Sequence, residues 1–147
     1  MLKEHAPVMS ISWERLHQDS RALAAALRPL GPFSALVAVS RGGLVPGAIV
    51  AKELDIRLVQ TVCISSYDGR QQHEPEVIKA IEGDGRGVLV IDDIADTGAT
   101  AEVVRRLLPG AHLACVYAKP RGKPYADTTA VDVPQNMWLS FPWEVEE

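Results

Sequence analysis

Three acidic side chains lie close together in the segment 88–100, VLVIDDIADTGAT. Asp92 and Asp93 come directly after an apolar run, and Asp96 precedes the segment 97–100, TGAT. Ionised carboxylates accept hydrogen bonds from sugar hydroxyls, ligate Mg²⁺ and stabilise positive charge that develops in a transition state. By contrast, threonine hydroxyls and the N–H groups at the start of a helix bind anions such as phosphate. The segment therefore predicts a ligand that joins a phosphate group to a sugar.

A second candidate anion site, Ser40-Arg41-Gly42-Gly43, follows another apolar run. Consecutive glycines reach backbone conformations that are closed to other residues, so their N–H groups can converge on an anion, and Arg41 adds a rigid positive fork. A tight turn with a solvent-facing arginine is the simpler alternative. Two anion sites with acids between them predict a sugar that carries phosphates at both ends and reacts through a cation.

The acids also have structural explanations. Asp96 is well placed to cap the helix that follows it, a common role for Asp that is compatible with phosphate binding nearby. Asp92 and Asp93 could belong to a buried salt bridge. No cationic residue is close to them in the sequence, however, and an unpaired buried charge is costly. We therefore favour a functional explanation for this pair.

The elements that must position these residues alternate between strand and helix. Apolar runs predict strands at 35–40, 56–65, 87–91 and 111–118, with an edge strand at 128–133, and helices are expected at 13–27 (capped by Ser12), 45–54 and 98–108. Strands that are apolar on both faces indicate a parallel α/β sheet. Ligands of such sheets bind beyond the carboxyl ends of the strands, where both anion sites are expected.

The connection between the second and third strands is unusual. Residues 65–86, SSYDGRQQHEPEVIKAIEGDGR, are polar and punctuated by glycine. A connection of this length in a compact domain is usually functional. We therefore expect this segment to be functional or mobile.

Composition limits the class of protein. The length of 147 residues suits a single domain, 47% hydrophobic and 23% charged residues are typical of a soluble globular protein, and a net charge of −4 argues against a nucleic-acid binder. The longest apolar runs are strand-sized, and the N-terminus lacks a signal-peptide pattern. Cys63 and Cys115 lie in apolar runs, which predicts buried strand thiols in a reducing cytosol.

The segment VLVIDDIADTGAT resembles the phosphoribosyl-pyrophosphate signature of type I phosphoribosyltransferases. Other stretches extend the resemblance over nearly the whole chain, to the bacterial xanthine-guanine phosphoribosyltransferases: VSRGGLVPGA, TVCISSYD, EGDGRG, YAKPRGKP and VPQNMW. The resemblance implies one domain over 1–147, with an α/β fold whose central, mostly parallel sheet is flanked by helices. It also implies a mobile active-site loop at about 65–76 and a small hood over the base site, formed by the terminal segments.

The resemblance assigns the residues that bind phosphoribosyl pyrophosphate. Asp92 and Asp93 would contact the ribose hydroxyls, with Asp93 the contact for Mg²⁺. The 5′-phosphate would be bound by Asp96, Thr97, Gly98, Ala99 and Thr100, and the pyrophosphate by Ser40, Arg41 and Gly42. His73 stands where the family carries a loop arginine, and Arg70 is a nearby alternative for that role. Ala99 replaces a glycine of close relatives but keeps its N–H group.

The resemblance also assigns the purine site. Asp96 would lie near N7 as the general base or as a hydrogen-bond partner, and Trp138 would stack on the base. Lys119 would bind the 6-oxo group, because an ammonium group donates and cannot accept a hydrogen bond. The backbone of Leu139 would contact the 2-substituent. The structural alternatives are a surface lysine at 119 and a core tryptophan at 138.

The implied function is purine salvage. The enzyme would transfer 5-phosphoribose from phosphoribosyl pyrophosphate to N9 of guanine, xanthine or hypoxanthine, giving GMP, XMP or IMP plus pyrophosphate, with Mg²⁺ as cofactor. It would be a cytoplasmic homotetramer that does not bind nucleic acid, and weak peripheral association with the inner membrane stays open. The alternatives are a hypoxanthine-preferring transferase and a nucleotide-binding regulator of transcription.

Overall fold

The protein folds around a six-stranded sheet in the order β4-β3-β2-β5-β6-β7. In this computed structural model the described residues are 6–68, 71–79 and 81–144, with side chains described for 6–64, 77 and 81–144. The strands are β2 (Ala35–Ser40), β3 (Val59–Asp68), β4 (Gln71–Lys79), β5 (Val88–Ala95), β6 (His112–Ala118) and β7 (Thr128–Asp132). All neighbouring strands pair in parallel except β3 and β4, which are antiparallel.

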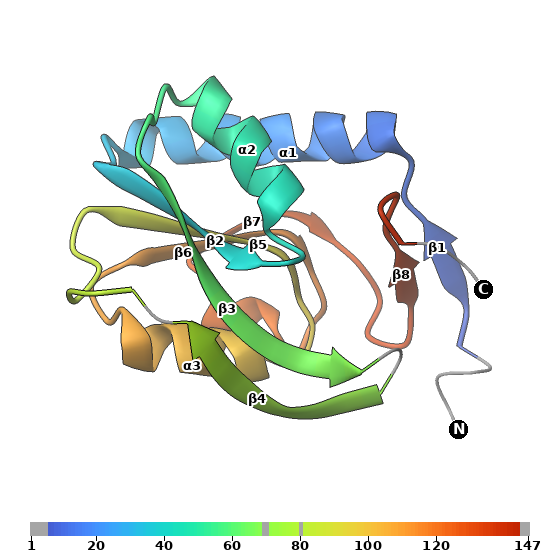
Figure 1. The fold of residues 1–147 in the computed structure, drawn as a ribbon. Coiled ribbons are helices and arrows are strands. Elements are labelled where there is room, and N and C mark those ends of the chain that lie inside the picture. The colour runs from blue at the N-terminus through green and yellow to red at the C-terminus, as the bar shows by residue number, and fades with distance from the viewer. Residues whose placement is uncertain (1–5, 69–70, 80, 145–147) are drawn as a thin grey trace.

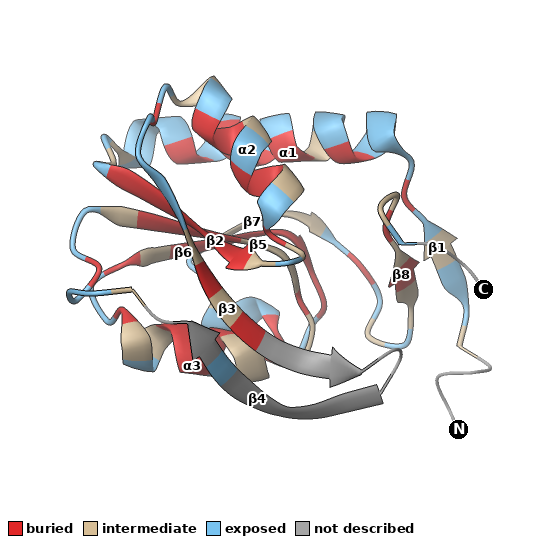
Figure 2. Ribbon diagram, in the orientation of Figure 1, coloured by how far each residue is buried: buried red, intermediate tan, exposed pale blue. Residues whose placement is uncertain are grey.

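Helices cover both faces of the sheet (Figure 1). Helices α1 (Trp13–Leu27) and α2 (Leu44–Glu53) lie on one face, and α3 (Ala99–Leu107) lies on the other. Alternate residues of one strand enter different cores: Leu36 packs in the cluster that includes α1, and Val37 in the cluster that includes α3. The apolar parts of the central strands are therefore largely buried (Figure 2), as the continuous apolar runs predict.

Helix boundaries follow local chemistry. The backbone N–H of Arg15 donates to Ser12 Oγ at 3.0 Å, which confirms Ser12 as the cap of α1. Helix α2 begins and ends one residue earlier than predicted, and α3 is one residue shorter at each end. The N-cap of α3 is Gly98, so the alternative explanation of Asp96 as the cap of this helix is wrong.

Two strand predictions need correction. The polar segment 65–86, predicted as a connection, contains the end of β3 and all of β4, which form an antiparallel hairpin. Strand β4 is an edge strand, where a proline such as Pro75 is tolerated. Strand β5 extends to Ala95 rather than residue 91, because it continues to pair with β6 as far as Ala95 opposite Ala118.

Both cysteines lie on strands, but only Cys115 is buried; Cys63 has intermediate exposure, so that part of the burial prediction is wrong. Burial and the neighbouring carboxylates raise the pKa of the Cys115 thiol. None of the helices in the described ranges is long and apolar enough to cross a membrane.

A small second sheet joins the two terminal segments. Strands β1 (Val8–Ser10) and β8 (Trp138–Ser140) pair in parallel, with Val8 opposite Trp138. Backbone hydrogen bonds of 2.8 Å extend this pairing at each end, from Trp138 N to the Pro7 carbonyl and from Ile11 N to the Ser140 carbonyl. The two strands lie together to one side of the central sheet (Figure 1).

Candidate active site

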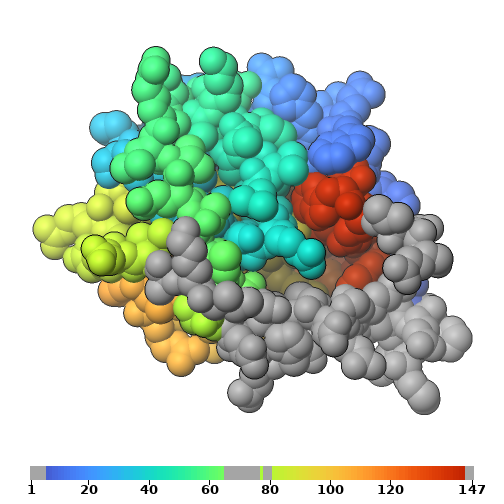
Figure 3. All heavy atoms as spheres, viewed as in Figure 1, coloured from blue at the N-terminus to red at the C-terminus, as the bar shows by residue number. Residues whose placement is uncertain are grey.

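Most of the predicted site residues lie at or near the carboxyl ends of three adjacent parallel strands. Strand β2 ends at Ser40, β5 ends just before Asp96, and β6 ends just before Lys119. The Lys119 N–H donates to the Ala95 carbonyl at 2.9 Å, which joins the ends of β5 and β6. Figure 3 shows a hollow in the surface between the start of α2 and the C-terminal segment, on this side of the molecule.

The segment after β2 packs directly on the acid row, by which we mean Asp92 and Asp93. A Cβ atom at Gly42 would overlap the carboxylate of Asp93, and one at Gly43 would overlap the Ile91 carbonyl. Neither glycine has a positive φ, so close backbone approach, and not a special conformation, is what requires glycine here. The Ser40–Arg41 peptide bond is cis, which nothing in the sequence indicates.

Asp92 and Asp93 lie within β5 and have intermediate exposure. Burial raises the pKa of both carboxyls, and the charge of Asp93 adds to the effect at Asp92. Their partners are local: the Asp93 N–H donates to Asp92 Oδ1 at 2.8 Å, and the Ile94 N–H to Asp93 Oδ1 at 2.7 Å. Within the described side chains neither forms an ion pair, so the salt-bridge explanation finds no support there.

The segment 97–100 forms the turn from β5 into α3. Gly98 is buried and has a φ of 94°, in the left-handed region that favours glycine. Its α-carbon packs against the ring of Tyr125, which leaves no room for a side chain. Thr97 Oγ1 accepts a hydrogen bond from the Ala99 N–H at 3.3 Å. Ala99 begins α3 and has no positive φ, so the alanine is compatible with this turn.

Lys119 and Asp96 form a largely buried ion pair. Lys119 Nζ lies 3.3 Å from Asp96 Oδ1, and Lys119 is only 5% exposed, so it is not a surface lysine. Gln135 Nε2 donates to the same carboxylate oxygen at 3.1 Å and to the Asp96 carbonyl at 3.2 Å. We did not predict a role for Gln135, although it stands within the motif VPQNMW that carried the resemblance.

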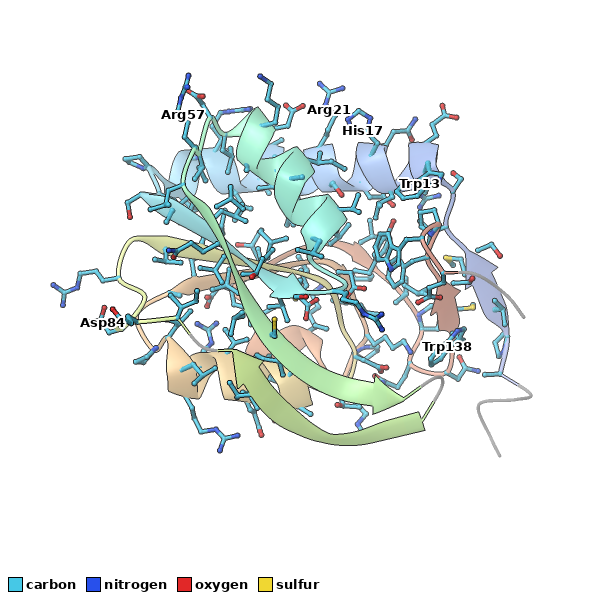
Figure 4. The ribbon with its side chains drawn as sticks, viewed as in Figure 1. Trp13, His17, Arg21, Arg57, Asp84 and Trp138 are labelled. Carbon is cyan, nitrogen blue, oxygen red and sulfur yellow. The ribbon has the colours of Figure 1, made fainter. Side chains whose placement is uncertain are left out.

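The remaining predicted residues lie at β8 and in the β3–β4 hairpin. Trp138 begins β8 and has intermediate exposure, whereas the Leu139 side chain is buried in the core. Figure 4 shows Trp138 at the opposite end of the molecule from Asp84, which precedes β5. His73 belongs to β4, but its side chain lies outside the described residues, as does Arg70.

The acid row can bind a cation with help from a ligand. In the described ranges, no group of three or more His, Cys, Asp or Glu side chains could hold a metal ion. Mg²⁺, however, is commonly bound by one or two carboxylates together with phosphate oxygens and water. Asp92 and Asp93 fit that role, because a cation would offset the burial and mutual repulsion of their charges.

Comparison with known proteins identifies the family. The phosphoribosyl transferase domain model matches residues 12–147. The chain is 51% identical to the xanthine-guanine phosphoribosyltransferase of Nitratidesulfovibrio vulgaris over 140 residues, covering 95% of this chain and 86% of the relative. It is 50% identical to the enzyme of the same name from Desulfotalea psychrophila over 147 residues, covering 99% of this chain and 92% of the relative.

Solved structures agree with this result. The purine phosphoribosyltransferase of Pyrococcus horikoshii superposes with a TM-score of 0.79 at 30% identity, over 95% of this chain and 96% of that one. The xanthine-guanine-hypoxanthine phosphoribosyltransferase of Helicobacter pylori superposes with a TM-score of 0.72 at 31% identity, over 94% of each chain. These matches confirm the predicted type I fold, and the chain belongs to the phosphoribosyl transferase domain family.

Proposed function

We propose that this protein is a purine-salvage enzyme that transfers 5-phosphoribose from phosphoribosyl pyrophosphate to N9 of guanine, xanthine or hypoxanthine. The observation that carries the proposal is the largely buried Lys119–Asp96 pair beside the segment 97–100, at the carboxyl ends of adjacent strands. The two xanthine-guanine phosphoribosyltransferases at about half identity support the same reaction.

The two anion-binding segments bind the two ends of phosphoribosyl pyrophosphate. Asp96 and the segment 97–100 bind the 5′-phosphate, with the N–H groups at the start of α3 as donors. Ser40, Arg41 and Gly42 bind the pyrophosphate. The contact between Gly42 and Asp93 supports this assignment, because it fixes one segment directly against the acid row that lies between the two anion sites.

The acid row binds the ribose. The carboxylates of Asp92 and Asp93 accept hydrogen bonds from the ribose hydroxyls and stabilise positive charge as it develops at C1′. Asp93 also contacts Mg²⁺, which when bound neutralises charge on the pyrophosphate leaving group. The raised pKa of each carboxyl supports a site that becomes complete only with a ligand.

The purine is bound at the carboxyl ends of β5 and β6 and at the start of β8. Lys119 donates a hydrogen bond to the 6-oxo group, so a 6-amino purine such as adenine lacks the acceptor that this site requires. Trp138 stacks on the base, and the Leu139 backbone contacts the 2-substituent. As the C1′–O bond to pyrophosphate breaks and the C1′–N9 bond forms, the proton that leaves N7 passes to the Asp96 carboxylate.

The β3–β4 hairpin is the element suited to exclude water. Strand β3 pairs Cys63 with Ser40, the last residue of β2, and continues to Asp68, so the hairpin extends past the pyrophosphate segment. Residues 65–76 close over the ligand, and His73 or Arg70 contacts the pyrophosphate. Closure would protect the oxocarbenium-like transition state from hydrolysis.

The proposal extends to the assembly and its location. As the resemblance implies, the enzyme is a cytoplasmic homotetramer, and weak peripheral membrane association stays an open question. Analytical ultracentrifugation would give the oligomeric state, and co-sedimentation with anionic vesicles would test the membrane association.

Steady-state turnover tests the function. Guanine, xanthine, hypoxanthine and adenine are each offered with phosphoribosyl pyrophosphate and Mg²⁺, and pyrophosphate release is measured. We expect turnover with the 6-oxopurines, none with adenine, and loss of activity when EDTA removes the metal. The proposal would be refuted if adenine were the only one of the four bases that supports pyrophosphate release, or if pyrophosphate were released equally well without a base.

A further inference from the structure

We propose that Gln135 is a positioning residue that fixes the orientation of the Asp96 carboxylate during catalysis. This inference rests on the proposed function, in which Asp96 accepts a proton from the purine. Gln135 has intermediate exposure and lies in the connection between β7 and β8. Its side chain is the only glutamine among the described side chains that is hydrogen-bonded to a residue of the candidate site.

The amide of Gln135 is held at both ends. Its Oε1 accepts a hydrogen bond from the Arg121 N–H at 2.8 Å, and because a backbone N–H can only donate, this contact fixes which end of the amide is oxygen. The Nε2 group is thereby directed at Asp96, where it lies 3.1 Å from Oδ1 and 3.2 Å from the carbonyl oxygen. One donor group thus binds both the side chain and the backbone of Asp96.

This arrangement restrains the carboxylate against Lys119. An ammonium–carboxylate hydrogen bond is normally about 2.7–2.9 Å long. Lys119 Nζ lies 3.3 Å from Asp96 Oδ1, which is longer, and Gln135 contacts the same oxygen from a different element. Without Gln135, the carboxylate could rotate towards Lys119 and form a shorter ion pair with it. The ammonium group would then be less able to donate a hydrogen bond to the 6-oxo oxygen of the purine. Gln135 therefore limits how closely the proton acceptor approaches the ammonium group that binds the purine.

The position of Gln135 in the chain supports this role. It stands three residues before Trp138, and its partner Arg121 stands two residues after Lys119. The amide therefore ties together the segment that carries Lys119, the segment that leads to Trp138, and Asp96 itself. A catalytic group must be held within a fraction of an ångström of its productive geometry, and residues of this kind provide that support.

Two variants separate positioning from a general structural role. Gln135→Glu keeps the size of the side chain and can still accept from the Arg121 N–H, but it cannot donate to Asp96 and adds a repelling charge. Gln135→Met loses both contacts. Gln18→Met, which changes an exposed glutamine on α1, is the control. Each protein is assayed for kcat, for KM with guanine and phosphoribosyl pyrophosphate, and for thermal unfolding.

We expect both Gln135 variants to lower kcat by about tenfold to a hundredfold, with KM for phosphoribosyl pyrophosphate within about threefold of the wild type. Gln18→Met should match the wild type. If Gln135→Glu keeps the wild-type kcat, Gln135 serves only to hold Arg121 and the inference is wrong, whatever Gln135→Met does. If the wild type itself turns over none of the four bases, the proposed function fails and the inference fails with it.

Discussion

The carboxylate of Asp93 packs directly against the α-carbon of Gly42. Gly42 follows the end of β2, and Asp93 lies within β5. These two strands are neighbours in the sheet. The segment proposed to bind pyrophosphate and the acid proposed to contact Mg²⁺ therefore form one packed unit. A change at either residue is expected to displace the other.

Replacing Gly42 by alanine tests this contact. The added Cβ would overlap the Asp93 carboxylate, so Gly42→Ala should lower kcat/KM for phosphoribosyl pyrophosphate by about a hundredfold, since a displacement near 1 Å can have that effect. Gly31→Ala is the control, because a Cβ there would make only ordinary contacts, the nearest at 3.4 Å to Phe33. Wild-type kinetics in Gly42→Ala would show that Asp93 can move without cost.

The buried ammonium group of Lys119 should determine which purines the enzyme uses. Lys119→Met removes the donor proposed for the 6-oxo group, and kcat/KM for guanine should fall by roughly a hundredfold, as is typical when one partner of a buried charge pair is truncated. The Lys119→Met variant should not use adenine at the rate at which the wild type uses guanine. Lys123→Met is the control, because Lys123 is exposed and its ammonium group pairs with Asp132. Equal losses in both variants would contradict the assignment.

The acid row should destabilise the ligand-free protein near neutral pH. Burial holds the pKa of Asp92 well above its usual value, so this group stabilises the fold when protonated and ceases to do so as the pH rises through its folded pKa. In the presence of EDTA, Asp92→Asn should therefore raise the free energy of unfolding at pH 7, and the gain should vanish below about pH 4. Urea denaturation of both proteins across this range measures the difference. A variant less stable than the wild type at pH 7 would refute this account.

Asp127 should behave in the opposite way. Burial disfavours its charge, but the Leu113 N–H at 2.8 Å and Arg105 together lower its pKa. A lowered pKa stabilises the fold above the unfolded value and loses that effect as the pH falls through the folded value. Asp127→Asn should therefore destabilise the protein at pH 7 but not in strong acid. The same denaturation series measures it, and identical pH profiles for Asp127→Asn and Asp92→Asn would contradict both assignments.

The sequence predicts most elements of the fold because their signals are local. Helix α1 matches its prediction at both ends, since Ser12 provides a cap and apolar residues recur at helical spacing. The β3–β4 hairpin was missed because its residues are polar, although the Asp-Gly pair at 68–69 is a typical hairpin signal. Strand β5 runs past its apolar part because pairing with β6, which is not local, continues through Asp92.

The candidate site was predictable in its residue types but not in its contacts. The acids, the glycines and Lys119 are visible in the sequence, yet the reason that position 42 must be glycine lies in Asp93, far along the chain. Gln135 was missed because its contacts, too, are with residues that are distant in the sequence. Its partners, Asp96 and Arg121, come close only when the ends of β5 and β6 and the segment before β8 are assembled.

Gly98, in the segment 97–100, provides a test of 5′-phosphate binding. In Gly98→Ala the Cβ would overlap the Tyr125 ring and the residue would hold a φ of 94°, so KM for phosphoribosyl pyrophosphate should rise by about tenfold or more while KM for guanine changes little. Adding Tyr125→Ala removes the overlap but not the left-handed backbone, whose cost is roughly 1–2 kcal/mol for a residue with a Cβ. The double variant should therefore recover only part of the loss. Full recovery would mean that the ring contact alone requires glycine, and an unchanged KM in Gly98→Ala would place the 5′-phosphate elsewhere.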